Sequence, residues 1–390
     1  MANNFNRNSG KPTGQLLTYL PSPYWGGGPG QTCVSLLENI PDDIFRKILV
    51  LPKLQRAIPK SITVKQTVSF ILRRFRYDWD RGVESLNKYF PRMITTADPD
   101  RTIVHFWPQP PMSLVKSAQS RGMITVREMT NTFRGTAKEI LDAAYDRHGI
   151  RPAHGITEES VELEREELSL YDHVFAPNPF VEASLLEAGV VASRILPSSY
   201  GWTPARFPHR SNDNRTSQFR VLFVGVVCVG KGVPELLTAW QKSGVEGELV
   251  LAGPIEESIR PLLNSNALKD RIRVLNFVED LGALYRASDV FVFPTWTEGG
   301  PQVTYEAAGC GLPVVTTPMG AGRLVKNEVN GLIVKSGDVD GLAEAIARMA
   351  ASREFRECLG RQAKTDARKF TYEQLGLDRA KKLGALLEKR

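Results

Sequence analysis

Two glutamates, Glu298 and Glu306, stand eight positions apart around the start of a predicted helix. Two glycines and a proline lie between them at residues 299–301, where glycine lets a ligand approach the backbone and proline suits the first helical turn. The N–H groups of residues 300–303 would face an anion such as a diphosphate. Glu306 could then accept hydrogen bonds from a pair of ribose hydroxyls, and Glu298 could reach a sugar beyond the phosphates. The alternative is an ordinary αβ unit with two solvated glutamates.

The residues around this pair have the pattern of a strand, a loop, a helix and a second strand. Residues 290–293 are apolar, as in a buried parallel strand, and Pro294 ends them. The helix is predicted to run to about Cys310, because Gly311 and Pro313 stop it before the next strand. Both glutamates are therefore expected beyond the carboxyl end of a buried strand.

This unit resembles a known family signature. The motif E-G-x-x-x-x-x-x-E before G-x-G-x-P-V-V, at residues 298–315, resembles that of retaining, family-four glycosyltransferases of the group 1 type. Residues 176–190, APNPFVEASLLEAGV, resemble the last unit of that family's first domain. The resemblance implies an α/β fold of the GT-B class, with two facing Rossmann-like domains, parallel sheets and a cleft between them. It also implies a retaining hexosyl-type enzyme that moves a sugar from a nucleotide donor to an acceptor.

Length and composition agree with a globular, two-domain protein. The 390 residues suffice for two domains of roughly 200 residues. The net charge of +7 favours an anionic partner, which could be nucleic acid, a phosphorylated substrate or a membrane surface. The four cysteines are widely spaced and lack a C-x-x-C motif, which favours reduced thiols in a cytoplasmic protein over disulfides or zinc. The longest apolar run, residues 221–229, is too short to span a membrane, so any membrane contact is expected to be peripheral.

Alternating strand and helix patterns set the predicted domain limits. Residues 1–14 are polar and expected to be disordered. An N-terminal Rossmann-like acceptor domain is predicted over residues 15–202, and a C-terminal nucleotide-sugar domain over residues 219–371. The polar, proline-containing residues 203–218 between them are interpreted as a linker. The resemblance implies that a last helix, residues 372–390, crosses back to the first domain.

Candidate residues in the first domain follow predicted strands. The glycine loop at residues 26–30 joins a strand to a helix but fits neither a Walker motif nor G-x-G-x-x-G, so it could face a ligand or be only a tight turn. His105 and Glu128 lie at carboxyl ends of strands, where open α/β sheets bind ligands. For His105 a structural role is an equal alternative. The histidine that the family has after the next strand is replaced here by Arg127-Glu128-Met129.

In the second domain, Lys231 stands beside the entrance of a helix, so its ammonium could stabilise a leaving diphosphate. The family pairs this lysine with an arginine about five residues earlier, where this chain has Val226. That departure removes one positive charge from the expected phosphate site. Arg323, at a position where the family commonly has glutamate, could compensate for it.

A basic segment offers a possible membrane contact. Residues 46–81 contain ten Lys or Arg against two acids. Within it, residues 64–76 have apolar positions at helical spacing with Arg73, Arg74 and Arg76 around them, a pattern that could form a helix lying on an anionic membrane. The alternative is a surface helix with a solvated basic face. No nucleic-acid-binding module is recognised.

The predicted site combines these candidates. The catalytic candidates are Glu298, Lys231 and His105. The donor-binding candidates are Glu306, Gly299, Gly300, Pro301, Gln302, Gly225, Asn276, Phe277, Val278 and Arg323. The acceptor-side candidates are Gly27, Gly28, Trp107 and Glu128. We expect no metal and no cofactor beyond a UDP- or GDP-sugar as substrate, a glycan or lipid-linked acceptor, and a role in cell-envelope polysaccharide or glycolipid synthesis.

Three other functions use the same features. Paired glutamates also occur in glycosidases, but there they come from different strand ends, not from one helix start. A non-catalytic sugar-nucleotide-binding protein is consistent with Val226. A sugar phosphorylase that uses inorganic phosphate is the third alternative.

Overall fold

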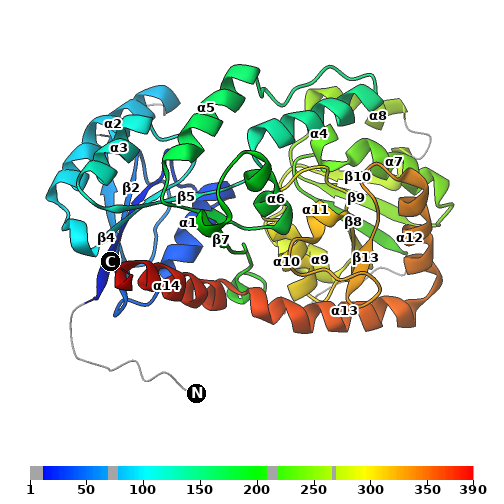
Figure 1. The fold of residues 1–390 in the computed structure, drawn as a ribbon. Coiled ribbons are helices and arrows are strands. Elements are labelled where there is room, and N and C mark those ends of the chain that lie inside the picture. Colours follow the sequence, from blue (N-terminus) through cyan, green and yellow to red (C-terminus); the bar gives the residue numbers. More distant parts are fainter. Residues whose placement is uncertain (1–11, 69–77, 209–217, 266–268, 390) are drawn as a thin grey trace. The chain divides into compact units, whose positions relative to one another are not determined.

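A computed structural model describes residues 12–68, 78–208, 218–265 and 269–389, and contains two parallel β-sheets with helices around them (Figure 1). The chain divides into two compact units. Unit 1 comprises Met1–Glu128, Glu167–Phe175 and Glu373–Arg390, and unit 2 comprises Met129–Glu166 and Ala176–Tyr372. Among the described residues, no helix is both long and apolar enough to cross a membrane.

The first sheet has seven strands in the order β3-β2-β1-β4-β5-β6-β7. The strands are β1 (Gly14–Tyr19), β2 (Phe45–Leu51), β3 (Ile62–Gln66), β4 (Thr102–Phe106), β5 (Ile124–Glu128), β6 (His173–Ala176) and β7 (Ile195–Pro197). The helices between and after them are α1 (Gly28–Glu38), α2 (Trp79–Thr96), α3 (Met112–Ser120), α4 (Arg134–Arg147), α5 (Glu158–Leu170), α6 (Pro179–Glu187) and α14 (Tyr372–Glu388). All residues of β4 and β5 are buried, as expected of strands covered on both faces.

The second sheet has six strands in the order β10-β9-β8-β11-β12-β13, all paired in parallel. The strands are β8 (Arg220–Val224), β9 (Glu248–Ala252), β10 (Ile272–Leu275), β11 (Val290–Phe293), β12 (Val314–Thr316) and β13 (Gly331–Ile333). The helices are α7 (Val233–Lys242), α8 (Arg260–Ser265), α9 (Leu281–Arg286), α10 (Gln302–Gly309), α11 (Pro318–Ala321), α12 (Val339–Ala351) and α13 (Arg353–Ala367).

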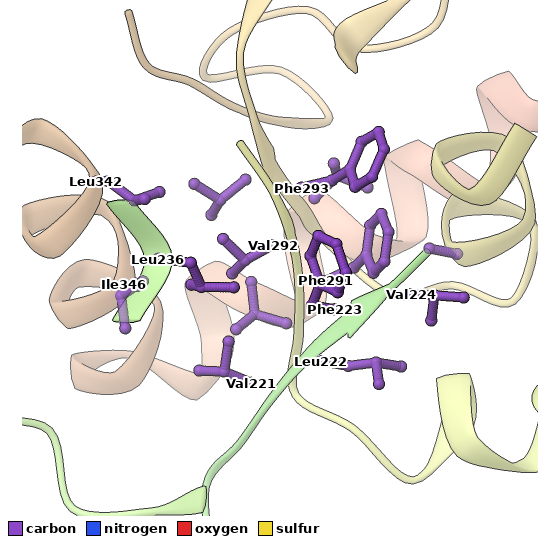
Figure 2. Packing of buried hydrophobic residues seen from close by; sticks show 14 of the residues in the cluster. Val221, Leu222, Phe223, Val224, Leu236, Phe291, Val292, Phe293, Leu342 and Ile346 are labelled. Atoms are coloured by element: carbon purple, nitrogen blue, oxygen red, sulfur yellow. The ribbon is translucent and has the colours of Figure 1, made fainter. Parts of the chain in front are cut away.

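Aliphatic and aromatic side chains from strands and helices meet in the core of this second sheet (Figure 2). Phe223 of β8 and Phe293 of β11 have ring centroids 5.8 Å apart. Leu236 of α7 and Ile346 of α12 belong to the same fully buried cluster. This packing fixes β8 and β11, whose carboxyl ends lead into the loops that carry Lys231 and Glu298.

These sheets confirm the predicted α/β fold with two parallel, Rossmann-like sheets, but one predicted helix is wrong. Residues 64–66 belong to strand β3, not to a basic helix, because the β-branched run at residues 62–64 pairs in parallel with β2. The rest of that predicted helix, with Arg73, Arg74 and Arg76, falls largely outside the described residues. The predicted domain limits remain a prediction.

Candidate active site

The loops after β8 and β11 approach each other closely in unit 2. Lys231 ends a short 3-10 turn (Val229–Lys231), and Gly232 follows with a φ of 70°. A Cβ at position 232 would lie 2.0 Å from the carbonyl oxygen of Pro294, so only glycine fits there. The N–H of Trp296 also donates to the carbonyl of Gly230 at 3.0 Å. This contact brings Lys231 to the loop that holds the first glutamate.

Lys231 and Glu298 form an ion pair in which Nζ lies 2.5 Å from Oε1. The same ammonium donates to the carbonyl oxygen of Thr297 at 3.2 Å. Both side chains are about one-fifth exposed, at 24% and 17%. The structure therefore brings together two of the three predicted catalytic residues, and an incoming anion would compete with Glu298 for the ammonium.

Glu306 lies in α10 and is buried, with 7% of its surface exposed. The hydroxyl of Tyr285 donates to its Oε2 at 3.3 Å, and the guanidinium of Arg206 lies 3.9 Å from its Oε1. Burial raises the pKa of Glu306 to about 7, although Arg206 and Tyr285 act in the opposite direction. A carboxylate so weakly paired retains the capacity to accept hydrogen bonds from hydroxyl groups.

Tyr285 and Arg206 were missed from the sequence. Arg206 belongs to a 3-10 turn (Pro204–Arg206) in the segment interpreted as a linker, where a lone arginine carries no signal. Tyr285 lies in α9 and is fully buried, so its type and position resemble those of an ordinary core residue. Their closeness to Glu306 depends on the tertiary fold.

Gly299 and Gly300 are explained by protein packing, although the sequence suggested close approach of a ligand. A Cβ at position 299 would lie 2.1 Å from the carbonyl oxygen of Thr130, and one at position 300 would lie 2.4 Å from the ring of Tyr200. The expected row of free N–H groups is also shorter, because Gln302 donates to the carbonyl of Gly300 at 2.8 Å. Pro301 is the residue just before α10.

The other donor-side candidates lie at the carboxyl edge of the second sheet. Gly225 follows β8 and donates its N–H to Ala252 at 2.9 Å. Asn276, Phe277 and Val278 follow β10, and Phe277 is 87% exposed. These positions lie where ligands bind in open α/β sheets. Val226, next to Gly225, is exposed as well.

Arg323 is already bound within unit 2. Its guanidinium donates to the carbonyl of Ser198 at 2.6 Å and forms an ion pair with Glu182. Its backbone N–H donates to the hydroxyl of Tyr305 at 3.1 Å. The positive charge that could compensate for Val226 is therefore paired with a carboxylate in this conformation.

His105, Glu128 and Arg379 form a buried network in unit 1. Nε2 of His105 lies 3.1 Å from Glu128, and Arg379 of α14 contacts both carboxylate oxygens of Glu128 at 2.6 and 2.8 Å. Burial alone would raise the pKa of Glu128, but Arg379 and His105 hold it at about 2. Burial also lowers the pKa of His105. An ionised carboxylate thus pairs a buried arginine and a neutral histidine, and Arg379 was missed from the sequence.

The acceptor-side candidates have unlike surroundings. Trp107 is fully buried, as is Glu128. Gly27 and Gly28 lie at the start of α1, where Gly28 has a φ of 57° and Gly27 is extended. The glycine loop is therefore a tight helix entrance, and its two glycines are the more accessible members of the group.

The described part of the chain has no obvious metal-binding site. No group of three or more His, Cys, Asp or Glu side chains there has the arrangement to hold a metal ion. Charged groups at the candidate site include those of Lys231, Glu298, Glu306 and Arg206.

Comparisons with known proteins match residues 218–352 and the fold. The family model described as glycosyl transferases group 1 matches residues 218–352. The capsular polysaccharide biosynthesis glycosyltransferase CapM of Staphylococcus aureus is 33% identical over 159 residues, which is 38% of this chain and 40% of that protein. The match thus spans about two-fifths of that relative's length.

Solved glycosyltransferase structures share the fold over nearly the whole chain. Sucrose-phosphate synthase from Thermosynechococcus elongatus has a TM-score of 0.74 at 18% identity, covering 97% of this chain and 100% of that one. HepE from Anabaena, in complex with UDP-glucose, has a TM-score of 0.68 at 16% identity, covering 95% and 99%.

The family match covers both glutamates and Lys231, and the structural match covers both sheets. At such low identity the structural likeness establishes the fold alone. The chain thus has the GT-B fold, and its residues 218–352 match the model of the glycosyl transferases group 1 family.

Proposed function

We propose that this protein is a glycosyltransferase that moves a sugar from a nucleotide diphosphate donor to an acceptor with retention of anomeric configuration. The observation that carries the proposal is the Lys231–Glu298 pair, which lies just before the helix that holds the buried Glu306. A nucleotide sugar has a diphosphate between two sugars. The cation can bind the diphosphate, and the two carboxylates can accept hydrogen bonds from the sugars. The family match over residues 218–352 supports the same function.

Each residue has a role in this proposal. Glu306 accepts hydrogen bonds from the ribose, and Glu298 from the transferred sugar. Lys231, with the backbone at Gly299 and Gly300, binds the diphosphate and stabilises the charge that grows as it leaves. One well-placed donor of this kind contributes about 3 kcal/mol to lowering a barrier.

The donor is proposed to be a UDP- or GDP-sugar, and no metal is required for its departure. The solved complex of HepE with UDP-glucose supports a uridine nucleotide at the level of the fold. The base would lie near Asn276, Phe277 and Val278, beyond the end of β10. Gly225, Pro301, Gln302 and Arg323 complete the proposed donor side.

The acceptor is proposed to be a growing glycan or a lipid-linked sugar in cell-envelope polysaccharide or glycolipid synthesis. The similarity to CapM, a glycosyltransferase of capsular polysaccharide biosynthesis, supports this class. The acceptor side of the proposal consists of Gly27, Gly28, Trp107 and Glu128, with His105 as the catalytic candidate beside them.

A cytoplasmic enzyme with such an acceptor would work at the inner face of a membrane, held there by basic residues. Sedimentation with anionic vesicles should fall when Arg73, Arg74 and Arg76 are changed to glutamine. A control protein with three exposed basic residues of the second domain changed in the same way should still sediment; these are Arg348, Arg353 and Arg361. Unchanged sedimentation of the first variant would end the membrane proposal.

Calorimetric titration with UDP and with GDP, without divalent metal, tests the donor site. Wild type should bind one of the two nucleotides, and Glu306→Ala should lose that binding. The exposed Glu344→Ala on α12 is the matched control and should bind like wild type. Binding of neither nucleotide by wild type would contradict the proposal.

The exposed Val226 favours one alternative, a sugar-nucleotide-binding protein without turnover. Saturable binding with no release of nucleoside diphosphate in the presence of acceptors would support that alternative. Phosphate-dependent release of sugar 1-phosphate would support a phosphorylase.

A further inference from the structure

The segment that follows β5 lies directly against the loop of Glu298. The carbonyl oxygen of Thr130 occupies the space beside Gly299 where a Cβ would lie, and the hydroxyls of Thr132 and Thr297 are 3.3 Å apart. All these residues belong to unit 2. The segment thus lies beside the proposed sugar-diphosphate site.

Asn131, in this segment, has a fixed amide orientation. Its Oδ1 accepts hydrogen bonds from the hydroxyl of Thr297 and from the N–H of Thr132, both at 2.8 Å. Because the backbone N–H of Thr132 can only donate, the atom that it meets is the amide oxygen, and the NH2 group is the other arm of the amide. Within the described ranges, Nδ2 donates to no protein acceptor, and the residue is half-buried. Two oriented donors are thus left for a ligand.

Asn131 is bound to the loop that holds the Lys231–Glu298 pair. Thr297 connects the two, because its hydroxyl binds Asn131 and its carbonyl oxygen accepts from Lys231 at 3.2 Å. The site is short of cationic partners, since Val226 is apolar and Lys231 is paired with Glu298. Neutral donors can add to anion binding there without needing a counter-charge.

We propose that Asn131 is a substrate-contacting residue whose NH2 group donates hydrogen bonds to an oxygen of the donor's sugar-diphosphate. Thr297 is its positioning residue, because its hydroxyl holds the amide oxygen and so aims the NH2 group. This inference rests on the proposed function and extends it to a residue from the part of the chain before the family match, residues 218–352.

The test compares Asn131→Asp with wild type in titrations of UDP or GDP, whichever wild type binds, and of the matching nucleoside monophosphate. Aspartate keeps an oxygen for Thr297 and for the N–H of Thr132, but replaces the NH2 donors with a second, anionic oxygen. Nucleoside diphosphate affinity should fall by about 10- to 100-fold. The monophosphate should lose less, because it lacks the outer phosphate. Asn264→Asp, an exposed change on α8 with the same charge, should bind like wild type.

The negative charge of Asn131→Asp could prevent folding, so a second, uncharged variant is needed. Asn131→Ala removes the donors without adding a charge and should weaken diphosphate binding by about tenfold. Thr297→Val keeps Asn131 but removes the hydroxyl that holds its amide oxygen. Diphosphate affinity should therefore fall, but by less than in Asn131→Ala. Wild-type diphosphate affinity in either folded Asn131 variant would overturn the inference while leaving the proposed function intact. Failure of wild type to bind UDP and GDP would overturn both.

Discussion

Replacing the buried Glu306 with glutamine should stabilise the unliganded protein, and the gain should depend on pH. Burial raises the pKa of Glu306 from 4.5 to about 7, so the folded state disfavours the ionised form. In the unfolded chain this carboxyl ionises near its ordinary pKa. Between these two values the folded state binds more protons than the unfolded state, so the stability contributed by the protonated form is lost as pH rises.

The magnitude follows from the size of this pKa change. One unit corresponds to about 1.4 kcal/mol, so the ionised Glu306 costs the folded state about 3 kcal/mol at pH 8. At pH 5 most of that cost is absent, and about 1 kcal/mol remains. Glutamine has nearly the same shape, can still accept from Tyr285 and never ionises. Arg206 is 46% exposed, so losing its partner should cost little.

Urea unfolding of wild type and Glu306→Gln at pH 5 and pH 8 measures the effect. The variant should be more stable by about 3 kcal/mol at pH 8 and by about 1 kcal/mol at pH 5. Glu344→Gln, at an exposed position, controls for the loss of one negative charge and should show no such pH dependence. An equal difference for Glu306→Gln at both pH values would refute the reasoning, because only titration in the folded state makes the two differ.

Three further changes test contacts of the site and of the core. Glu298→Gln releases Lys231 from its ion pair, so UDP affinity measured by calorimetry should rise several-fold while sugar transfer is lost; weaker UDP binding would mean that Glu298 orients the ammonium. Arg379→Met leaves a carboxylate buried without its cation and should destabilise the protein by about 3 to 5 kcal/mol in urea unfolding, whereas an undiminished midpoint would contradict the ion pair. Gly232→Ala should lower the Tm more than Gly122→Ala, because both glycines have positive φ but only the first would place a Cβ against backbone, at 2.0 Å.

Local patterns were enough to predict the strand and the helix on either side of Glu298. Strand β11 has the bounds predicted for it, residues 290–293, and helix α10 ends at Gly309, one residue before the predicted end, because an apolar run and a Gly-Pro stop mark these limits in the sequence. Strand β3 was mistaken for a helix because its apolar positions fit both periods over a few residues. Its partner β2 decides the matter, and that pairing is not local.

The candidate site was predictable where residue type and spacing along the chain carry the information. Glu298 and Glu306 belong to one loop and one helix, so their placement followed from the sequence. Arg206 and Tyr285 come from other segments and meet Glu306 only in the fold. Gly299 shows a different limit, because a glycine that admits a ligand and one that admits the backbone of Thr130 look alike in a sequence.

The charge of the site cannot be read by counting basic residues in the motifs. Lys231 and Arg323 both carry a positive charge, yet each forms an ion pair with a glutamate in the structure. Glu298, for its part, is held by Lys231 before any substrate arrives. A ligand with a diphosphate and a sugar could replace this ion pair with two new interactions. The diphosphate would bind the ammonium of Lys231, and the sugar hydroxyls would donate hydrogen bonds to the carboxylate of Glu298. In the proposed function, the pair would therefore favour a ligand that carries both parts over either part alone, and in this way it would select a sugar nucleotide.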